Sequence, residues 1–190
     1  LLKDIALTSM RSPAAVLLLA LSGCGSPSAD NATATTAAVS TSPGLAEGWT
    51  KPDACAVLAK ADYGQAVGQS VTNAELAMPH LSDGTTAATS ECKYTLADGG
   101  RYSVMLRWSP INDNSEGAIN TTRSGLSQVA EAFGATMETV PDLGKAAFWL
   151  DKTGSLNVFI GEDRMAIINV PTGPAAKDQA ISLARALGAE

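Results

Sequence analysis

The chain has 190 residues, of which 45% are hydrophobic and 17% are charged, a balance typical of one folded domain rather than two. The 13 Lys and Arg against 19 Asp and Glu give a formal net charge of -6, which would repel a nucleic-acid backbone, so we expect no nucleic-acid partner. The apolar run Ala14 to Leu21 falls short of the roughly 20 residues that a transmembrane helix needs.

Residues 1–23 have the three parts of a secretory signal peptide: basic residues, an apolar run and small residues after it. The run ends in Leu21-Ser22-Gly23-Cys24, which resembles the lipobox of bacterial lipoproteins. In that motif the Cys receives a diacylglyceryl group and the chain is cut just before it, so the resemblance implies a lipidated Cys24. An ordinary signal peptide with a chance Cys is the alternative, and Met10 is an alternative start.

Residues 24–49 are the predicted tether between this anchor and the folded domain. They are rich in Ser, Thr, Ala and Pro, a composition that buries too little apolar surface to offset the entropy of ordering. Two or more acyl chains hold a protein stably at a membrane, so lipidation at Cys24 predicts an extracytoplasmic, membrane-anchored protein. No acidic residue directly follows Cys24. By resemblance this favours the outer membrane where the organism has one, and otherwise the cell membrane.

Residues 50–190 are the predicted globular domain, and it opens with two short helices. Pro52 and Asp53 predict a helix start, with Asp53 as the N-cap and with Cys55, Val57 and Leu58 facing inward. A second helix is predicted from Asp62 to Val67, ending at Gly68. From Val71 to Glu91 the signals are weak, and Ser82-Asp83-Gly84 predicts a long loop.

Apolar and polar residues then alternate over Cys92–Leu96 and Tyr102–Trp108, on both sides of Asp98-Gly99-Gly100. Period two around a Gly-rich turn is typical of a β-hairpin. The alternation places Tyr102, Val104, Leu106 and Trp108 in the core. Ser103, Met105 and Arg107 are expected on the opposite face.

The rest of the domain is predicted to contain a helix, three strands and a final helix. Leu126, Val129, Ala130 and Phe133 have helical spacing within a predicted helix from Ser115 to Phe133, which Gly134 ends. Three strands are predicted at Ala146–Leu150, Leu156–Ile160 and Met165–Val170, and Pro174 precedes a last helix whose inner face holds Ala180, Leu183, Ala184 and Leu187. Without regular βαβ alternation, these elements predict an α+β fold with an antiparallel sheet of about five or six strands and helices mainly on one face.

Cys55 and Cys92 are the remaining cysteines, an even pair in a compartment that permits disulfides. We expect them to be bonded, and two free buried thiols are the alternative. The closed loop of about 38 residues corresponds to roughly 4 kcal/mol in the chain-entropy model, an upper figure.

Several of these residues carry a family resemblance. Asp53-Ala-Cys55-Ala-Val-Leu58, Glu91-Cys92-Lys-Tyr94 and the segment from Val140 to Trp149 resemble a group of uncharacterised bacterial lipoprotein domains. Members often carry Asp-x-Cys-x-Leu-Leu, a Cys followed by an aromatic residue, and Gly-x-x-Ala-x-Trp. The resemblance implies an extracytoplasmic α+β domain and no particular reaction.

The polar residues predict no catalytic, metal or cofactor site. His80 is the single histidine, so any Ser/His/Asp or Cys/His arrangement must use it, and no Gly-x-Ser-x-Gly elbow is present. With Asp83 it offers fewer ligands than zinc needs. Glu162-Asp163-Arg164 is interpreted as a solvated hairpin turn rather than an acid/base pair.

Aromatic residues on the predicted strands allow a ligand groove or a packed core: Tyr102, Trp108, Phe148, Trp149 and Phe159. Core packing is favoured. Because Phe148 and Trp149 are adjacent, they point to opposite faces of a strand, and one of them is a candidate for the uncovered side. Trp149, Met105 and Arg107 are therefore the candidate binding residues.

These features favour a membrane-anchored, non-enzymatic binding or interaction module whose partner is an envelope protein or a small apolar ligand. Its recognition surface is expected on the sheet face opposite the helices or at the segment from Val71 to Glu91. A small envelope hydrolase or modifying enzyme with an unrecognised carboxylate site is the alternative. A purely structural envelope lipoprotein is a third hypothesis.

Overall fold

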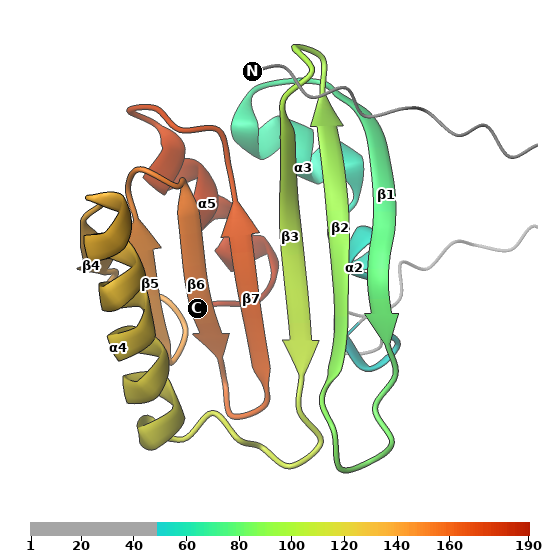
Figure 1. The fold of residues 1–190 in the computed structure, drawn as a ribbon. Helices are drawn as coiled ribbons and strands as arrows, with labels where there is room; N and C mark the ends of the chain where they lie inside the picture. Colours follow the sequence, from blue (N-terminus) through green and yellow to red (C-terminus); the bar gives the residue numbers. More distant parts are fainter. Residues whose placement is uncertain (1–48) are drawn as a thin grey trace, which may run out of the picture. The chain divides into compact units, whose positions relative to one another are not determined.

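The computed structural model describes residues 49–190 (Figure 1). The predicted signal peptide, the predicted lipidation site Cys24 and all but the last residue of the predicted tether lie outside the described residues. The helices are α2 (Ala54–Val57), α3 (Lys60–Val67), α4 (Glu116–Phe133) and α5 (Ala176–Ala186). The strands are β1 (Val71–His80), β2 (Ala88–Leu96), β3 (Arg101–Trp108), β4 (Met137–Thr139), β5 (Ala146–Leu150), β6 (Ser155–Ile160) and β7 (Arg164–Asn169).

The strands form one antiparallel, seven-stranded sheet in the order β1-β2-β3-β7-β6-β5-β4. It consists of two runs of sequential neighbours, β1 to β3 and β4 to β7. From β3 the chain passes through α4 to the far edge strand β4, and the return meander brings β7 beside β3, where Val104 pairs with Ile168. The predicted α+β class is confirmed, with β1 and β4 added to the expected strands.

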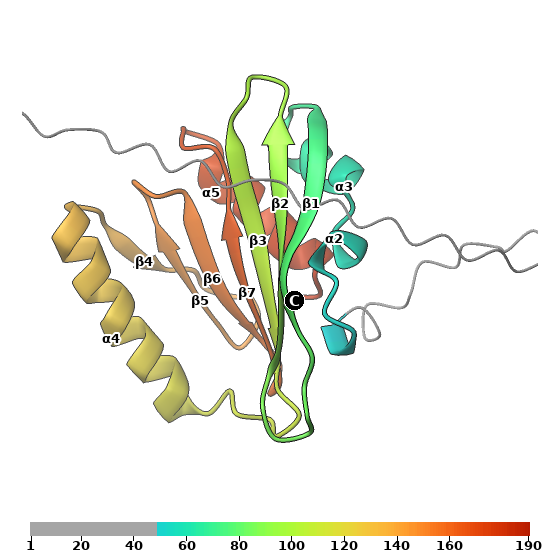
Figure 2. The same ribbon diagram turned by 45° about the vertical axis from the view of Figure 1, so that its right-hand side comes forward.

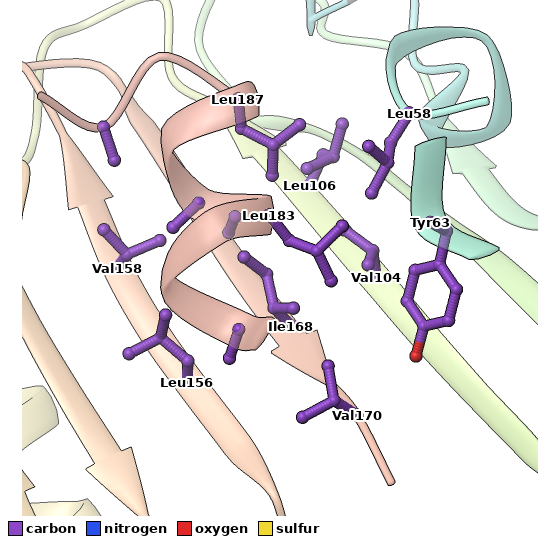
Figure 3. Packing of buried hydrophobic residues seen from close by; sticks show 14 of the residues in the cluster. Leu58, Tyr63, Val104, Leu106, Leu156, Val158, Ile168, Val170, Leu183 and Leu187 are labelled. Atoms are coloured by element: carbon purple, nitrogen blue, oxygen red, sulfur yellow. The ribbon is translucent and has the colours of Figure 1, made fainter. Parts of the chain in front are cut away.

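One face of the sheet is covered by α2, α3 and α5 (Figures 1 and 2). Leu183 and Leu187 of the last helix pack there against Val104 and Ile168, and none of the four exceeds 1% exposure (Figure 3). Burying a side chain of this size fully stabilises the fold by about 1.5 to 3 kcal/mol. The core-facing assignments for β3 and for the last helix are therefore confirmed.

The long helix α4 lies on the opposite face, beside β4 and β5 (Figures 1 and 2). The expectation that helices lie mainly on one face holds for three helices and fails for this one. Under α4 the strands are buried on both sides: Phe148 is buried although its neighbour Trp149 faces the core cluster. Continuous apolar strands of this kind are expected wherever both faces are covered.

The N-cap predicted at Asp53 and the helix stops predicted at Gly68 and Gly134 are confirmed, and the structure adds an N-cap at Ser115. The Asp53 side chain accepts a hydrogen bond from the Ala56 amide at the start of α2, and the Ser115 side chain accepts one from the Ala118 amide at the start of α4. Gly68 and Gly134 end α3 and α4 in the left-handed conformation, with φ of 70° and 59°.

The prediction of a long loop from Val71 to Glu91 is wrong. This segment contains all of β1 and the start of β2, and the connection spans only residues 81–87. As an edge strand, β1 lacks the regular alternation that sequence patterns detect, and its pairing is interrupted by register shifts, one of them between Ala77 and His80. Irregularities and a Pro such as Pro79 are typical of edges, because they discourage pairing with other chains.

The disulfide prediction is confirmed: Cys55 and Cys92 are bonded, with their Cα atoms 4.9 Å apart. The bond joins α2 to β2 on the covered face. Nearby, the Ser90 hydroxyl accepts a hydrogen bond from the Ala54 amide at 3.0 Å, and the Tyr94 hydroxyl donates to the Leu58 carbonyl at 2.7 Å. The first helix is thus held to the sheet by covalent and polar contacts as well as by packing.

Gly144, in the connection between β4 and β5, has a specific structural role. Its φ is +59°, and a Cβ at this position would lie 2.3 Å from the Phe159 carbonyl oxygen. The next residue, Lys145, donates its amide to that same oxygen at 2.8 Å. Only glycine fits this close approach of the chain to β6 without strain.

Candidate functional site

No helix of residues 49–190 covers the second face of the sheet over β1, β2 and β3, because α4 lies over the other end (Figure 2). We call this uncovered side of β1–β3, together with the adjoining Asn169 of β7, the open face. Pairing places Glu75 opposite Lys93 and Lys93 opposite Ser103, so their side chains share this side of the sheet. The uncovered area is where the sequence analysis expected a recognition surface.

The open face contains a hollow of about 410 Å³, a size within the range of small-ligand sites. It is lined by residues of β1, β2, β3 and β7: Asn73, Glu75, Glu91, Lys93, Tyr94, Thr95, Arg101, Tyr102, Ser103 and Asn169. Carboxylates and cations are mixed in this lining. The hollow therefore suits a polar ligand that offers both hydrogen-bond donors and acceptors.

Only some of the charged side chains that line the hollow have a partner within the domain. Lys93 lies 3.7 Å from a Glu91 carboxylate oxygen, and their side chains are 55% and 16% exposed. Among residues 49–190, the side chains of Glu75 and Arg101 have no ion pair or hydrogen bond, and both residues are exposed. Charged groups left without a partner at a concave surface are available to a ligand.

Asn169 connects the open face to the core. Its side-chain amide donates to the Ser103 hydroxyl at 3.2 Å, while its backbone carbonyl accepts from the Tyr63 hydroxyl at 2.6 Å. Tyr63 stacks on Tyr94, with ring centroids 4.1 Å apart and an interplanar angle of 7°. Burial raises the pKa of Tyr63 and of Tyr94 well above the usual value, so both remain neutral hydrogen-bond donors. Hydrogen bonds and ring stacking therefore hold Asn169 and Tyr94, which line the hollow, to the core.

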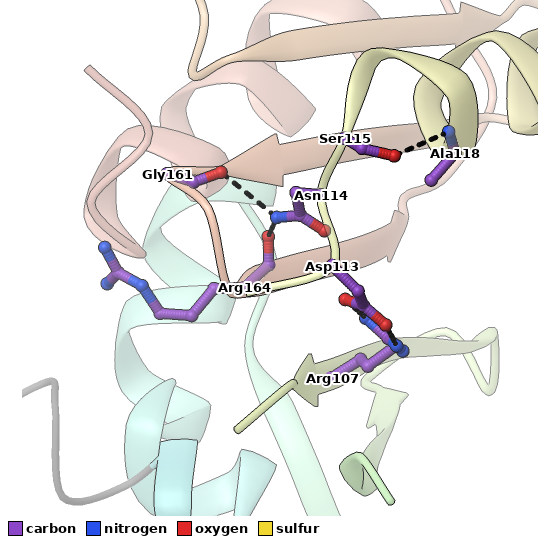
Figure 4. A network of polar contacts seen from close by, with 7 residues as sticks. All are labelled: Arg107, Asp113, Asn114, Ser115, Ala118, Gly161 and Arg164. Carbon is purple, nitrogen blue, oxygen red and sulfur yellow. Dashed lines mark hydrogen bonds and ion pairs between the residues drawn. The ribbon is translucent and has the colours of Figure 1, made fainter. Parts of the chain in front are cut away.

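Met105 and Arg107 lie on the predicted side of β3, opposite the buried Val104 and Leu106. Arg107 is not free, because its guanidinium forms a two-pronged ion pair with Asp113 in the loop before α4 (Figure 4). The Arg107 hydrogen bond lowers the pKa of the Asp113 carboxyl. Arg107 therefore holds the loop before α4 in place, in addition to its predicted role as a binding residue.

Trp149 does not lie on the surface. It is 5% exposed and belongs to the core cluster, while Phe148 is buried on the other side of β5. Adjacent strand residues do point to opposite faces as expected, but here both faces are covered. Core packing, the favoured interpretation, therefore holds for Phe148, Trp149 and Phe159, whereas Tyr102 and Trp108 are half-buried.

Other polar candidates of the sequence occupy turns. Asp83 accepts hydrogen bonds from the Thr85 and Thr86 amides, at 2.8 Å each, which lowers its pKa below the usual range. In the turn between β6 and β7, Glu162 pairs with Lys145 at 2.6 Å, and the half-buried Asp163 accepts from the Trp108 indole. The interpretation of this turn as solvated therefore fits Glu162 better than Asp163.

Sequence reasoning missed Glu75 and Arg101 as site residues. Glu75 belongs to the strand predicted as a loop, and Arg101 lies one residue before the predicted hairpin strand. The alternation of Lys93, Thr95, Ser103 and Met105 was a usable signal for this side of the sheet. Placing Glu75 opposite Lys93 requires the pairing of β1 with β2.

Comparison with known proteins found no match: no family model, no curated protein and no solved structure matches the chain. Within residues 49–190, no group of three or more His, Cys, Asp or Glu residues could hold a metal ion. No helix in that range has the length and apolar character needed to cross a bilayer.

Proposed function

We propose that this protein is a bacterial envelope lipoprotein, anchored through Cys24, whose domain is a non-enzymatic binding module with the open face as its recognition surface. The observation that carries the proposal is the hollow of about 410 Å³ on the uncovered side of the sheet, with unpaired Glu75 and Arg101 in its lining. Antiparallel sheets commonly leave one face to solvent, where a partner can reach it.

The polar lining of the hollow favours one of the two expected partners, an envelope protein, over the other, a small apolar ligand. A small apolar ligand would remove Glu75 and Arg101 from water without giving either charge a partner, which is costly. A protein of the envelope with its own mixed charges could pair with them, and complementary charges favour specific association. We therefore propose an envelope protein as the partner.

None of the carboxyls with a shifted pKa is suited to act as a general acid. Hydrogen bonds lower the pKa of all three shifted carboxyls: those from the Thr85 and Thr86 amides to Asp83, from Arg107 to Asp113, and from the Thr136 amide to Asp151. A general acid needs the opposite shift, toward neutral pH.

Site-directed photo-crosslinking in intact membranes tests the recognition surface. A photoreactive amino acid at Arg101 should give a crosslinked envelope protein, and the same group at Glu131, exposed on α4, should not. Lys93→Glu should weaken the crosslink from position 101, whereas Arg123→Glu, a matched charge reversal on α4, should leave it unchanged. Equal crosslinking from positions 101 and 131 would contradict the proposed surface.

The anchor is tested separately by labelling with a fatty-acid analogue. Wild-type protein should incorporate the label and Cys24→Ala should not. Equal labelling of the two proteins would refute lipidation at Cys24 and leave the open-face proposal to the crosslinking experiment.

A further inference from the structure

β1 forms one edge of the sheet, and no other strand of residues 49–190 pairs with its outer side (Figure 1). In an antiparallel pair, alternate residues of a strand exchange hydrogen bonds with the neighbouring strand, and the residues between them point their N–H and C=O groups away from it. The outward groups of β1 have no backbone partner within the described domain. An unpaired edge of this kind can accept a strand from another chain.

The two edges of the sheet are protected to different degrees. β4, at the far edge, has only three residues, and very short edge strands are a usual protection against pairing with other chains. β1 has 10 residues, and its register shifts lie on either side of residues 73–77. Pairing past this segment is discouraged, because Met78 has a φ of 47° and Pro79 has no N–H. Residues 73–77 themselves pair regularly with β2, so this part of the edge is suited to a further strand.

The side chains of this segment differ between the two faces of the sheet. Leu76 pairs with the buried Cys92 and therefore lies on the helix-covered side, yet it is 38% exposed. Asn73 and Glu75 lie on the open face, where they line the hollow. The Glu75 carboxylate is exposed and forms no ion pair with residues 49–190. A strand beside β1 would therefore meet an apolar side chain on one face and an unpaired carboxylate on the other.

The charge of Glu75 distinguishes between two kinds of added strand. A second copy of this chain, paired antiparallel through β1 in the register centred on Glu75, would place two Glu75 side chains opposite each other, and like charges in that position are destabilising. A strand with Lys or Arg there would form a cross-strand ion pair instead. The net charge of -6 also favours a basic segment over a second copy.

From this arrangement we propose that the partner adds an extended, basic segment to β1 as a further strand of the sheet, with Lys or Arg beside Glu75 and an apolar residue beside Leu76. The inference rests on the proposed function, because it specifies how an envelope protein would bind at the β1 side of the open face. Main-chain hydrogen bonds to residues 73–77 would supply affinity, and the alternating side chains would supply specificity.

The test is an NMR titration of the full chain, labelled with ¹⁵N, with the capped peptide acetyl-Thr-Val-Lys-Val-Thr-amide. The peptide pattern reads the same in both directions, so it suits a parallel or an antiparallel strand. The backbone amide signals of residues 73–77 should shift saturably, and alternate amides of this segment should exchange with solvent more slowly when the peptide is bound. Acetyl-Thr-Pro-Lys-Pro-Thr-amide keeps the charge but cannot form a regular strand, and it should not bind.

A charge swap tests the contact with Glu75. Glu75→Lys should weaken binding of the Lys peptide at least about threefold, since it replaces an attraction by a repulsion. The variant should instead prefer the same peptide with Glu in place of Lys. Glu131→Lys, a matched charge reversal at an exposed position of α4, should bind the Lys peptide like wild type.

Three results would overturn the added strand: no saturable shift at residues 73–77, equal binding of the Val and Pro peptides, or an unchanged preference for Lys in Glu75→Lys. The proposed function is judged separately. A crosslink from position 101 to an envelope protein, in the absence of peptide binding, would support the open face as the recognition surface and refute only the added strand.

Discussion

The two long helices of the domain show how differently the two faces of one sheet are used. α5 buries Ala176, Ala180, Leu183 and Ala184 against the sheet, whereas α4, although longer, buries only Ala130. Phe133, at the end of α4, is 69% exposed. Both helices are amphipathic in sequence, so amphipathicity alone does not tell how much of a helix is covered.

The strands differ in the same way. β5 and β6 lie between helices on both faces and are almost entirely buried, while β2 and β3 alternate between buried and partly exposed residues. The comparison teaches that this domain builds one continuous core on the side of α2, α3 and α5. The second face is apolar where α4 covers it and mostly polar where it remains open, with Met105 among the exceptions.

The largest effect should come from the bond that fastens the covered face. Reducing the bond between Cys55 and Cys92, which are 37 residues apart, should lower the free energy of unfolding by at most about 4 kcal/mol, since the unfolded chain gains entropy. Denaturant unfolding with and without reductant measures this. The same reductant should not affect a variant with both cysteines replaced by Ala, and an unchanged midpoint in wild type would contradict the prediction.

The two sides of a single strand give the sharpest test of the comparison. Leu106→Ala should cost about 3 kcal/mol, because it leaves a cavity in the core. Met105→Ala, the next residue on the open side, should cost less than about 1 kcal/mol. Denaturant unfolding of both variants checks the order, and a larger loss for Met105→Ala would invert the assignment of the faces.

The ion pair beside the open face should make a small, pH-dependent contribution. Because Arg107 lowers the pKa of Asp113 in the folded state, the stabilisation is present above the unfolded pKa of about 4 and is lost as pH falls through the lower folded value. Asp113→Asn should therefore cost less than about 1 kcal/mol at pH 7, given its exposure. The difference from wild type should shrink below pH 4.

A double-mutant cycle identifies the partner of Asp113. Once Arg107 is replaced by Ala, Asp113→Asn should have little further effect on unfolding at pH 7. Fully additive losses would show that Arg107 is not the group that stabilises the carboxylate.

The smallest effect is expected on α4. Phe133→Ser removes an exposed ring and should change the free energy of unfolding by no more than about 0.5 kcal/mol. Leu183→Ala on α5 is the control, and its expected cost of about 3 kcal/mol is typical of a buried position. Thermal or denaturant unfolding compares the pair, and a comparable loss in both variants would mean that α4 contributes to the fold as much as α5 does.

Much of the chain's local structure was predictable because its signals lie within a few residues of each other. Asp53 and Ser115 cap their helices, Gly68 and Gly134 end theirs, and strands β5, β6 and β7 lie close to the predicted ranges. β1 was missed because an edge strand with Pro79 and shifts in register lacks period two. β4 was missed because its three residues are too few to show a pattern.

The sequence by itself determined the types of all elements except β1 and β4, the inward side of β3 and of the last helix, and the pairing of Cys55 with Cys92. These depend on local periodicity and on counting cysteines. Only the tertiary structure decided that α4 covers one end of the second face, that Trp149 is buried, and that Trp49 and Arg164 line one hollow. Such features follow from strand order, which is set by pairings between distant residues such as Val104 and Ile168, and no local pattern encodes a contact over that separation.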